Sequence, residues 1–203
     1  MGLFKYVFVP LMKLFVKEAI GFERIPAKGP VILVSNHASY IDGPLVIQLT
    51  EWHRSRWVHG IILKHIFDKN WFTRFFYGTI FRQIPANGSV EKALEAIKEH
   101  SCLILLFPEG GRTYDGKMQK ASHTGLGVLA SQTKAPVIPI GIEGTYGWWP
   151  RQNALPNFKP RCIAIRVGKP LRYTGKATKQ NHLRFQTKVM KAVAKSAHTT
   201  YPY

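Results

Sequence analysis

The sequence predicts a single α/β domain with a largely parallel central sheet flanked by helices. Short apolar runs alternate with helix-like segments along the chain, which is the pattern of strands joined by helical crossovers. The run Cys102–Phe107 is almost wholly apolar, as in a strand buried on both faces. The 203 residues, 45% of them apolar, show no internal repeat and no low-complexity linker, so one domain with one core is expected.

Strands are expected at the apolar runs that turn residues separate. These runs are Val31–Val34, Trp57–Leu63, Thr79–Ile84, Cys102–Phe107, Val137–Ile142 and Cys162–Val167. Helices are expected between them, at Pro44–Leu49, Ile66–Tyr77, Val90–His100 (with Ser89 as N-cap), Gly125–Gln132 and from Thr178 to Ala197. Residues 144–160, rich in Gly, Pro and Trp, are expected to form a loop.

The charge is strongly unbalanced. Lys and Arg number 29 against 11 Asp and Glu, which gives a net charge of +18, and no acidic residue occurs from Gly144 to Tyr203. Such a chain favours a polyanionic partner: nucleic acid, an anionic membrane surface, or a phosphorylated substrate or acidic carrier. Cys102 and Cys162 lie far apart without a CxxC spacing, and the histidines are scattered, so neither a disulfide scaffold nor a metal site is expected.

Residues 1–22 form an amphipathic segment, and residues 23–203 are expected to form the main domain. On a helical wheel one half of the segment is apolar and the other half basic; the apolar half holds Leu3, Phe4, Val7, Phe8, Leu11, Leu14 and Phe15, and the basic half Lys5, Lys13 and Lys17. Such a helix, kinked at Pro10, lies in the headgroup region of an anionic bilayer or packs on the protein's own core. No apolar run is long enough for a spanning helix, and a signal peptide is not expected.

The first candidate site follows the predicted strand Val31–Val34. His37 and Asp42 are five residues apart, so on a continuous helix they would point in different directions, whereas a strand-to-helix turn can bring them together. A carboxylate bonded to Nδ1–H leaves Nε2 free to accept a proton and stabilises the imidazolium that forms. The alternative is a structural or surface histidine.

The second candidate site follows the predicted strand Cys102–Phe107. There Gly110 and Gly111 free backbone amides and Arg112 supplies a guanidinium, which together suit a phosphate group. Glu109 would repel a phosphate unless it accepts a bond from a substrate hydroxyl or holds Arg112 in place. The alternative is a turn with a solvated ion pair.

In this order, the two segments resemble the motifs of the glycerolipid acyltransferase family, typified by 1-acylglycerol-3-phosphate acyltransferases. That family's NHxSxxD block corresponds to Asn36, His37, Ser39 and Asp42, and its FPEGTRS block appears as FPEGGRT, with Gly111 in place of threonine. A later proline-containing strand resembles Val137–Gly141. The resemblance spans the chain from Ile25 to Val167 and implies the family's layered α/β fold.

One block departs from the family pattern. The usual GxIxxDR segment corresponds here to Gly78–Ile84, with Gln83 and Ile84 where an acid and an arginine are expected. Arg82 is the neighbouring candidate for the missing arginine, and Lys64 matches a lysine of the family. The identity of the acyl acceptor therefore stays open.

The resemblance implies transfer of an acyl group from acyl-CoA or acyl carrier protein to the hydroxyl of a lysophospholipid, first of all 1-acylglycerol 3-phosphate. His37 would be the general base, Asp42 would orient it, and no cofactor besides the donor is expected. The substrate would be bound by Glu109, Gly110, Gly111, Arg112, Arg82 and Lys64. The resemblance also implies a peripheral or monotopic enzyme at the cytoplasmic face of a membrane.

Three other interpretations remain. An acyltransferase for a different acceptor, such as glycerol 3-phosphate or another lysolipid, fits the altered Gly78–Ile84 segment. A nucleic-acid-binding protein fits the charge, but zinc-finger spacing, an RNP-like aromatic run and a clear helix-turn-helix are all missing from the sequence. A non-catalytic membrane-surface protein on the same fold would have no need to keep both His37 and Asp42.

Overall fold

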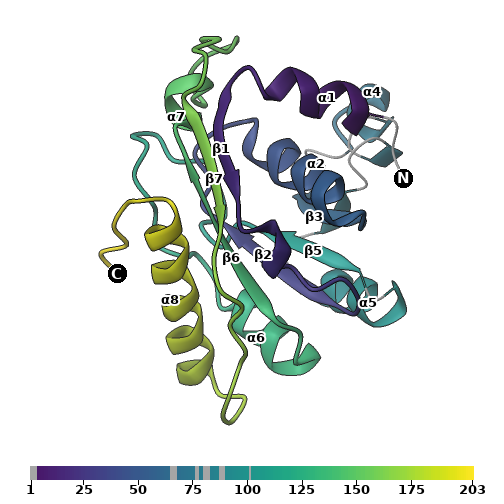
Figure 1. The fold of residues 1–203 in the computed structure, drawn as a ribbon. Helices are drawn as coiled ribbons and strands as arrows, with labels where there is room; N and C mark the ends of the chain where they lie inside the picture. The colour runs from purple at the N-terminus through teal and green to yellow at the C-terminus, as the bar shows by residue number, and fades with distance from the viewer. Residues whose placement is uncertain (1–3, 65–67, 76–77, 80–82, 87–89, 101) are drawn as a thin grey trace.

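The computed structural model describes residues 4–64, 68–75, 78–79, 83–86, 90–100 and 102–203. Its sheet has the strand order β1-β7-β6-β2-β5-β3-β4, and every neighbouring pair is parallel except β6 with β7 (Figure 1). The predicted fold class is thereby confirmed. The strands are β1 (Val16–Ile20), β2 (Val31–Ser35), β3 (Val58–Leu63), β4 (Ile84–Ala86), β5 (Leu103–Leu106), β6 (Val137–Glu143) and β7 (Ile163–Val167).

Helices cover both faces of the sheet and enclose two apolar cores. One face carries α1 (Lys5–Met12), the 3-10 turn η1 (Phe22–Arg24), α2 (Asp42–Arg54) and α7 (Thr145–Trp148), and the other carries α5 (Glu91–His100), α6 (Gly125–Thr133) and α8 (Lys179–Ser196). A further short helix is α4 (Trp71–Phe75). Successive side chains of β2 alternate between the cores, because strand side chains point to opposite faces: Val31 and Leu33 enter the first core, Ile32 and Val34 the second.

Most predicted elements are confirmed, and the third predicted strand is displaced. Thr79 lies in a helical turn, and the strand of this region is β4, which begins at Ile84 and contains Pro85. Pro85 is tolerated because β4 is the outermost strand and pairs only with β3, so a missing N–H breaks no second ladder. Residues 80–82, Ser89 and the ends of the predicted helix Ile66–Tyr77 lie outside the described residues.

The N-terminal segment folds differently from one continuous amphipathic helix. The helix α1 ends at Met12, and residues 16–20 form β1, which pairs in parallel with β7. This strand was not predicted, because the charged residues Lys17 and Glu18 interrupt the apolar run. Lys17 forms an ion pair with Glu143 of β6, and Glu18 forms one with Arg166 of the neighbouring strand β7.

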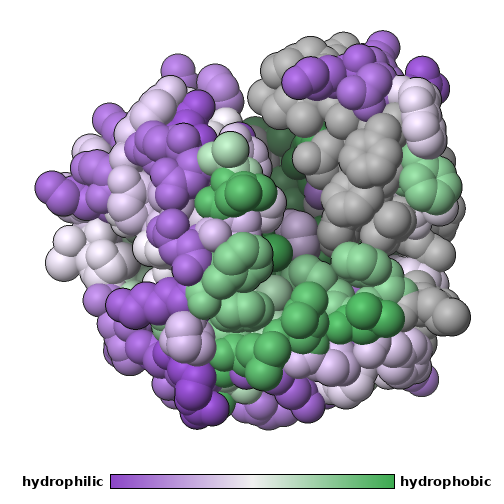
Figure 2. Space-filling view, turned by 90° about the horizontal axis from the view of Figure 1, so that it is seen from above, coloured by the Kyte–Doolittle hydropathy of each residue, from purple (hydrophilic) through white to green (hydrophobic). Residues whose placement is uncertain are grey.

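The helix α1 packs on the core with one face and leaves an apolar face exposed. Lys5, expected on the basic half, is only 3% exposed, and its Nζ donates to the backbone carbonyl of Glu51 beside buried Val9 and Met12. By contrast Val7, Leu11 and Leu14 are 70%, 55% and 60% exposed. From above, Figure 2 shows hydrophobic residues gathered in a continuous band at this end of the molecule. In the described part of the chain, no helix combines the length and apolar character that crossing a bilayer requires.

The predicted loop 144–160 contains the short helix α7, which begins directly after β6. Gly144 has a φ of +86°, and a side chain there would collide with the carbonyl oxygen of Cys162. Glycine is therefore required for the chain to leave β6 and turn into α7. The turn directs residues 149–152 toward the end of β2, where the first candidate site lies.

Candidate active site

The structure brings His37 and Asp42 together at the carboxyl end of β2. Nδ1 of His37 lies 3.0 Å from Oδ2 of Asp42, whose side chain is fully buried in the first turn of α2. The same oxygen accepts the backbone N–H groups of Ala38 at 2.6 Å and Ser39 at 2.7 Å. Because Oδ2 is placed as an acceptor, Nδ1 carries the proton and donates, which leaves Nε2 as the basic nitrogen.

The imidazole of His37 is packed but accessible. It stacks on the ring of Phe107 with centroids 4.1 Å apart, and its side chain remains 20% exposed. Nε2 has no hydrogen-bond partner among the residues that the structure describes. A basic nitrogen held in a fixed orientation and free to receive a proton is what a general base requires.

Asn36 and Ser39, the other polar residues of the first motif, fasten the turn. The Asn36 amide donates to the carbonyl of Ile142 and accepts its N–H, both at 2.8 Å, which extends the pairing of β2 with β6 beyond the last backbone pair. The Ser39 hydroxyl donates to the carbonyl of Trp149 at 2.6 Å and accepts the N–H of Ile41 at 3.3 Å. These residues fix the conformation in which His37 meets Asp42.

Glu109 joins the second motif to the first. It is 5% exposed, and its carboxylate accepts the N–H of His37 at 2.9 Å and the N–H of Gln119 at 2.7 Å. Burial raises the pKa of Glu109 from 4.5 to about 7, although the two backbone bonds oppose the shift. Glu109 forms no ion pair with Arg112 in the described residues, so it braces the backbone of His37 and does not hold the guanidinium.

Only one of the two glycine amides of this motif is free. Gly110 has a φ of +77°, its N–H donates to the carbonyl of Phe107 at 3.0 Å, and a Cβ would lie 2.5 Å from the hydroxyl oxygen of Ser122. Its contribution is therefore conformational. The N–H of Gly111 is bonded to no other described residue, and the space where a Cβ would point is open.

Arg112 lies beside the turn that carries His37. Its guanidinium carbon is 3.5 Å from the ring centroid of Tyr40, and the next residue, Thr113, donates its N–H to the carbonyl of His37 at 3.0 Å. Arg112 is half-buried and has no carboxylate partner within the described ranges. Stacking on an aromatic ring fixes a guanidinium while leaving its N–H groups available for an anion.

Comparisons with known proteins identify the family of the chain. Residues 18–143 match the family model described as Acyltransferase, a stretch that contains both motifs. The chain belongs to the Acyltransferase family. The resemblance seen in the sequence motifs is thereby confirmed, and the fold and motifs are those of an acyltransferase-family domain.

Curated relatives of this acyltransferase-family chain include plant and yeast proteins. It is 30% identical over 149 residues to a 1-acyl-sn-glycerol-3-phosphate acyltransferase of Limnanthes douglasii, covering 69% of this chain and 49% of the relative. It is 27% identical over 159 residues to the Saccharomyces cerevisiae protein of the same name, covering 76% and 51%. The chain thus spans about half the length of the curated relatives it matches.

A solved structure shares the fold. It is the 1-acyl-sn-glycerophosphate (LPA) acyltransferase PlsC from Thermotoga maritima, with a TM-score of 0.69 at 21% identity. The match covers 96% of this chain and 80% of the solved chain, so nearly all of the fold described above is shared.

Two further binding residues expected from the sequence are Lys64 and Arg82. Lys64 is exposed directly after β3, at the edge where the parallel strands β2, β5 and β3 all end. Arg82 lies outside the described residues. Gln83 packs against the backbone of β3, since a Cβ on Gly60 would lie 3.4 Å from its Cδ. The neutral side-chain amide of Gln83 therefore stands where the resemblance leads to the expectation of an acid.

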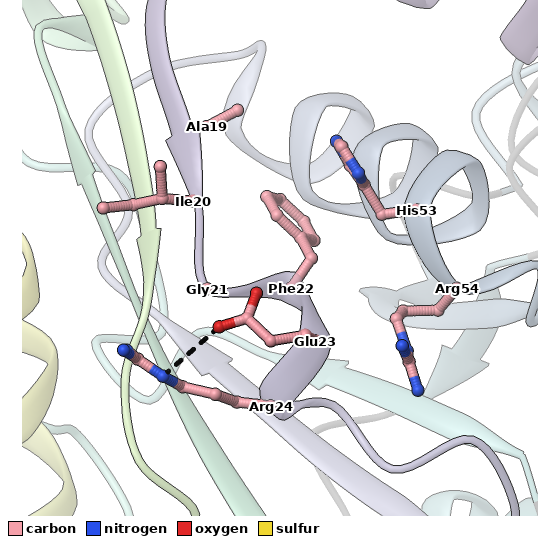
Figure 3. Close-up of a pocket in the computed structure, with 8 residues that line it drawn as sticks. All are labelled: Ala19, Ile20, Gly21, Phe22, Glu23, Arg24, His53 and Arg54. Atoms are coloured by element: carbon pink, nitrogen blue, oxygen red, sulfur yellow. Dashed lines mark ion pairs between the residues drawn. The ribbon is translucent and has the colours of Figure 1, made fainter.

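A pocket lies where the chain leaves β1. Since β1 runs antiparallel to β2, this is the edge of the sheet opposite to His37. His53 stacks on Phe22 in it, with centroids 4.6 Å apart, and both burial and nearby Lys13 lower the pKa of His53. None of the expected site residues faces this pocket, so it is separate from the candidate active site. It is lined by Ala19, Ile20, Gly21, Phe22, Glu23, Arg24, His53 and Arg54 (Figure 3).

Proposed function

We propose that this chain transfers a fatty acyl group from a thioester donor, acyl-CoA or acyl carrier protein, to the hydroxyl of a lysophospholipid. The first acceptor to consider is 1-acylglycerol 3-phosphate, which would give phosphatidic acid. The observation that carries the proposal is the bond of His37 Nδ1 to buried Asp42, which leaves Nε2 free at the end of β2. Family membership and the names of the curated relatives support the same reaction.

In the proposed reaction His37 activates the acceptor directly. Nε2 takes the proton of the acceptor hydroxyl while the hydroxyl oxygen bonds to the thioester carbonyl carbon. The tetrahedral intermediate then breaks its C–S bond, and the leaving thiolate takes the proton back from His37. Asp42 stabilises the imidazolium between the two steps. The products are the acylated acceptor and a free thiol, and the reaction needs no cofactor beyond the donor.

The second motif would bind the acceptor headgroup. The guanidinium of Arg112 and the free N–H of Gly111 offer donors to phosphate oxygens beside the turn that holds His37. Lys64, at the same edge of the sheet, would add a positive charge. Glu109 would act through His37 as a positioning residue, because both of its oxygens are bonded to backbone amides.

The exposed face of α1 supports attachment to a membrane surface. Leu14 precedes β1, and β1 begins at the edge where β2 ends, because β1 runs opposite to β2. Of the exposed apolar residues Val7, Leu11 and Leu14, Leu14 therefore lies toward the edge of the sheet that holds His37. A peripheral enzyme bound through this face, at the cytoplasmic surface of an anionic membrane, would present its active site to lipids in that membrane.

A different acceptor is the second candidate, and the segment around Gln83 favours it. An amide and an isoleucine stand where the resemblance leads one to expect an acid and an arginine, so contacts to the acceptor differ at this point. Glycerol 3-phosphate or another lysolipid would be acylated by the same His37 chemistry.

A panel of acceptors tests both candidates. The purified chain is incubated with acyl-CoA or acyl carrier protein and, separately, with 1-acylglycerol 3-phosphate, other lysophospholipids, glycerol 3-phosphate and monoacylglycerol, and products are identified by mass spectrometry. We expect phosphatidic acid as the main product. Turnover only with another acceptor would support the second candidate, and turnover with none would contradict the proposed function.

A further inference from the structure

The loop after α7 is fastened to the turn that carries His37. Ser39 forms an isolated β-bridge with Pro150, and its hydroxyl donates to the carbonyl of Trp149. The hydroxyl of Tyr40 lies 3.5 Å from the carbonyl oxygen of Arg151, and the ring of Tyr40 lies 5.2 Å from that of Trp149. This loop follows the stretch 18–143 that matches the family model, so the match assigns it no role.

Within this loop, the side chain of Arg151 reaches across to Arg112. Nη1 of Arg151 donates to the backbone carbonyl of Arg112 at 2.9 Å. The guanidinium of Arg151 lies 3.8 Å from the ring centroid of Tyr114, as that of Arg112 lies 3.5 Å from the ring of Tyr40. Both arginines are half-buried, and each guanidinium lies on the face of a tyrosine ring. The hydrogen bond from Arg151 links the loop after α7 to the segment that carries Arg112.

The two cations have no acid to neutralise them. Neither Arg112 nor Arg151 forms an ion pair with a carboxylate in the part of the chain that the structure describes. The acids nearest to Arg112 in the sequence are Glu109 and Asp115: Glu109 accepts the N–H groups of His37 and Gln119, and Asp115 accepts bonds from Thr113 and Lys117. Because the bond from Arg151 holds its guanidinium against the backbone of Arg112, an anion that contacts both side chains would be bound by two positive charges.

We propose that Arg151 is the second guanidinium of the acceptor-phosphate site and that it selects phosphomonoester acceptors over phosphodiester ones. The inference rests on the proposed function and adds a specificity residue to it. A phosphomonoester carries close to two negative charges and three free oxygens, enough for both arginines, whereas a phosphodiester carries one charge and two free oxygens. Arg112 alone then suffices for a phosphodiester headgroup.

The test compares acceptors in Arg151 variants. With 1-acylglycerol 3-phosphate, R151Q should lower kcat/KM by about 10- to 100-fold, mostly through KM, because one charge-assisted contact is lost. With 1-acylglycerol 3-phosphoethanolamine and with monoacylglycerol the change should stay within about threefold. R151K keeps the charge but not the planar fork and should recover part of the loss. R184A removes an exposed arginine from α8 and serves as the matched control.

A purely structural role for Arg151 gives a different result. Loosening the loop would lower kcat for all three acceptors alike, and that outcome, or an unchanged KM for the phosphomonoester, would overturn the inference. Binding is measured separately by saturation-transfer NMR with glycerol 3-phosphate. Weaker binding to R151Q than to wild type supports the site even if the proposed transfer reaction is not found, and equal binding to both overturns it.

Discussion

The turn around His37 and the junction around Arg166 are polar clusters of one sheet that differ in how completely their groups are paired. At the junction, Arg166 binds Glu18 at 2.7 Å and Glu143 at 2.8 Å, and Glu143 also binds Lys17 at 3.0 Å. At the turn, the imidazole of His37 is bonded through Nδ1 alone, and the neighbouring arginines lack carboxylate partners, among the described residues.

The difference separates groups that hold the fold from groups available for chemistry. Paired charges at the junction tie β1, β7 and β6 together and leave little for a ligand to bind. At the turn, backbone bonds to Asp42 and Glu109 fix the geometry, while the groups facing outward keep free donors or acceptors. Changes at the turn should therefore alter turnover, and changes at the junction should alter stability.

Replacing His37 should have the largest effect. H37A removes the proposed base and should lower kcat by about 10³-fold while the chain stays folded by circular dichroism, since the ring is only partly buried. H198A, which removes an exposed histidine next to Glu143 at the junction, should keep wild-type turnover. Turnover of H37A close to that of wild type would remove the distinction between the two clusters.

Replacing Asp42 should have the next largest effect and should act on both properties. D42N keeps the shape but weakens the acceptor for Nδ1 and for two backbone N–H groups, so kcat should fall by about 10²-fold and unfolding free energy by about 1–3 kcal/mol. Steady-state kinetics and urea unfolding measure the two effects. D68N, at a surface ion pair with Arg74, should change neither; equal effects in both variants would contradict the account.

Glu109 should make stability depend on pH. Because its folded pKa of about 7 exceeds the ordinary 4.5, the folded chain holds this proton more tightly than the unfolded chain. The contribution of Glu109 to stability is therefore undiminished below pH 4.5 and falls as the pH rises to about 7, by up to about 3 kcal/mol. E109Q has no proton to lose and should lack this slope.

The measurement is urea unfolding of wild type and E109Q between pH 4.5 and 7.5. The difference in unfolding free energy between them should change across this range. E95Q, at an exposed glutamate of α5, should run parallel to wild type. Parallel curves for E109Q and wild type would show that Glu109 titrates normally.

The exposed face of α1 should govern membrane binding with a smaller effect. The double variant V7Q/L11Q removes two exposed apolar side chains without touching the buried face of α1, so partitioning onto phosphatidylcholine–phosphatidylglycerol vesicles should fall by about tenfold. Flotation assays measure it, and L183Q, at an exposed leucine of α8, is the control. Equal loss in both variants would indicate that no particular face binds lipid.

Replacing Arg166 should leave turnover unchanged. R166M leaves Glu18 and Glu143 without their shared partner, so unfolding free energy should drop by about 1–2 kcal/mol at low salt and less at high salt. Both values come from urea unfolding at two salt concentrations. A fall in kcat larger than the loss of folded protein would place the junction in the active site.

Hydropathy in the sequence predicted the buried central strands correctly but did not locate the two edge strands, β1 and β4. Strands β2, β5 and β6 lie between two cores and are almost wholly apolar, so hydropathy alone located them. The strand β1 carries Lys17 and Glu18, and β4 contains Pro85; edge positions tolerate both features, but hydropathy does not distinguish such segments from loops.

The candidate site was predictable as two motifs but not as one cluster. The spacing of His37 and Asp42 after an apolar strand made their contact a hypothesis, because a strand-to-helix turn can join two residues that a continuous helix keeps apart, and the structure shows the contact. The bond of Glu109 to the backbone of His37 spans 72 residues and that of Arg151 to Arg112 spans 39. Such contacts depend on how strands are ordered in the sheet, which local patterns do not specify.

Direct transfer by His37 is the central claim, and a single-turnover experiment tests it most directly. Wild type and H37A are mixed with an acyl thioester, first alone and then with 1-acylglycerol 3-phosphate, and intact protein and lipid products are followed by mass spectrometry. The account predicts phosphatidic acid from wild type only, with no acyl group attached to the protein at any time. An acylated protein that passes its acyl group to the acceptor, or product formation by H37A at the wild-type rate, would contradict it.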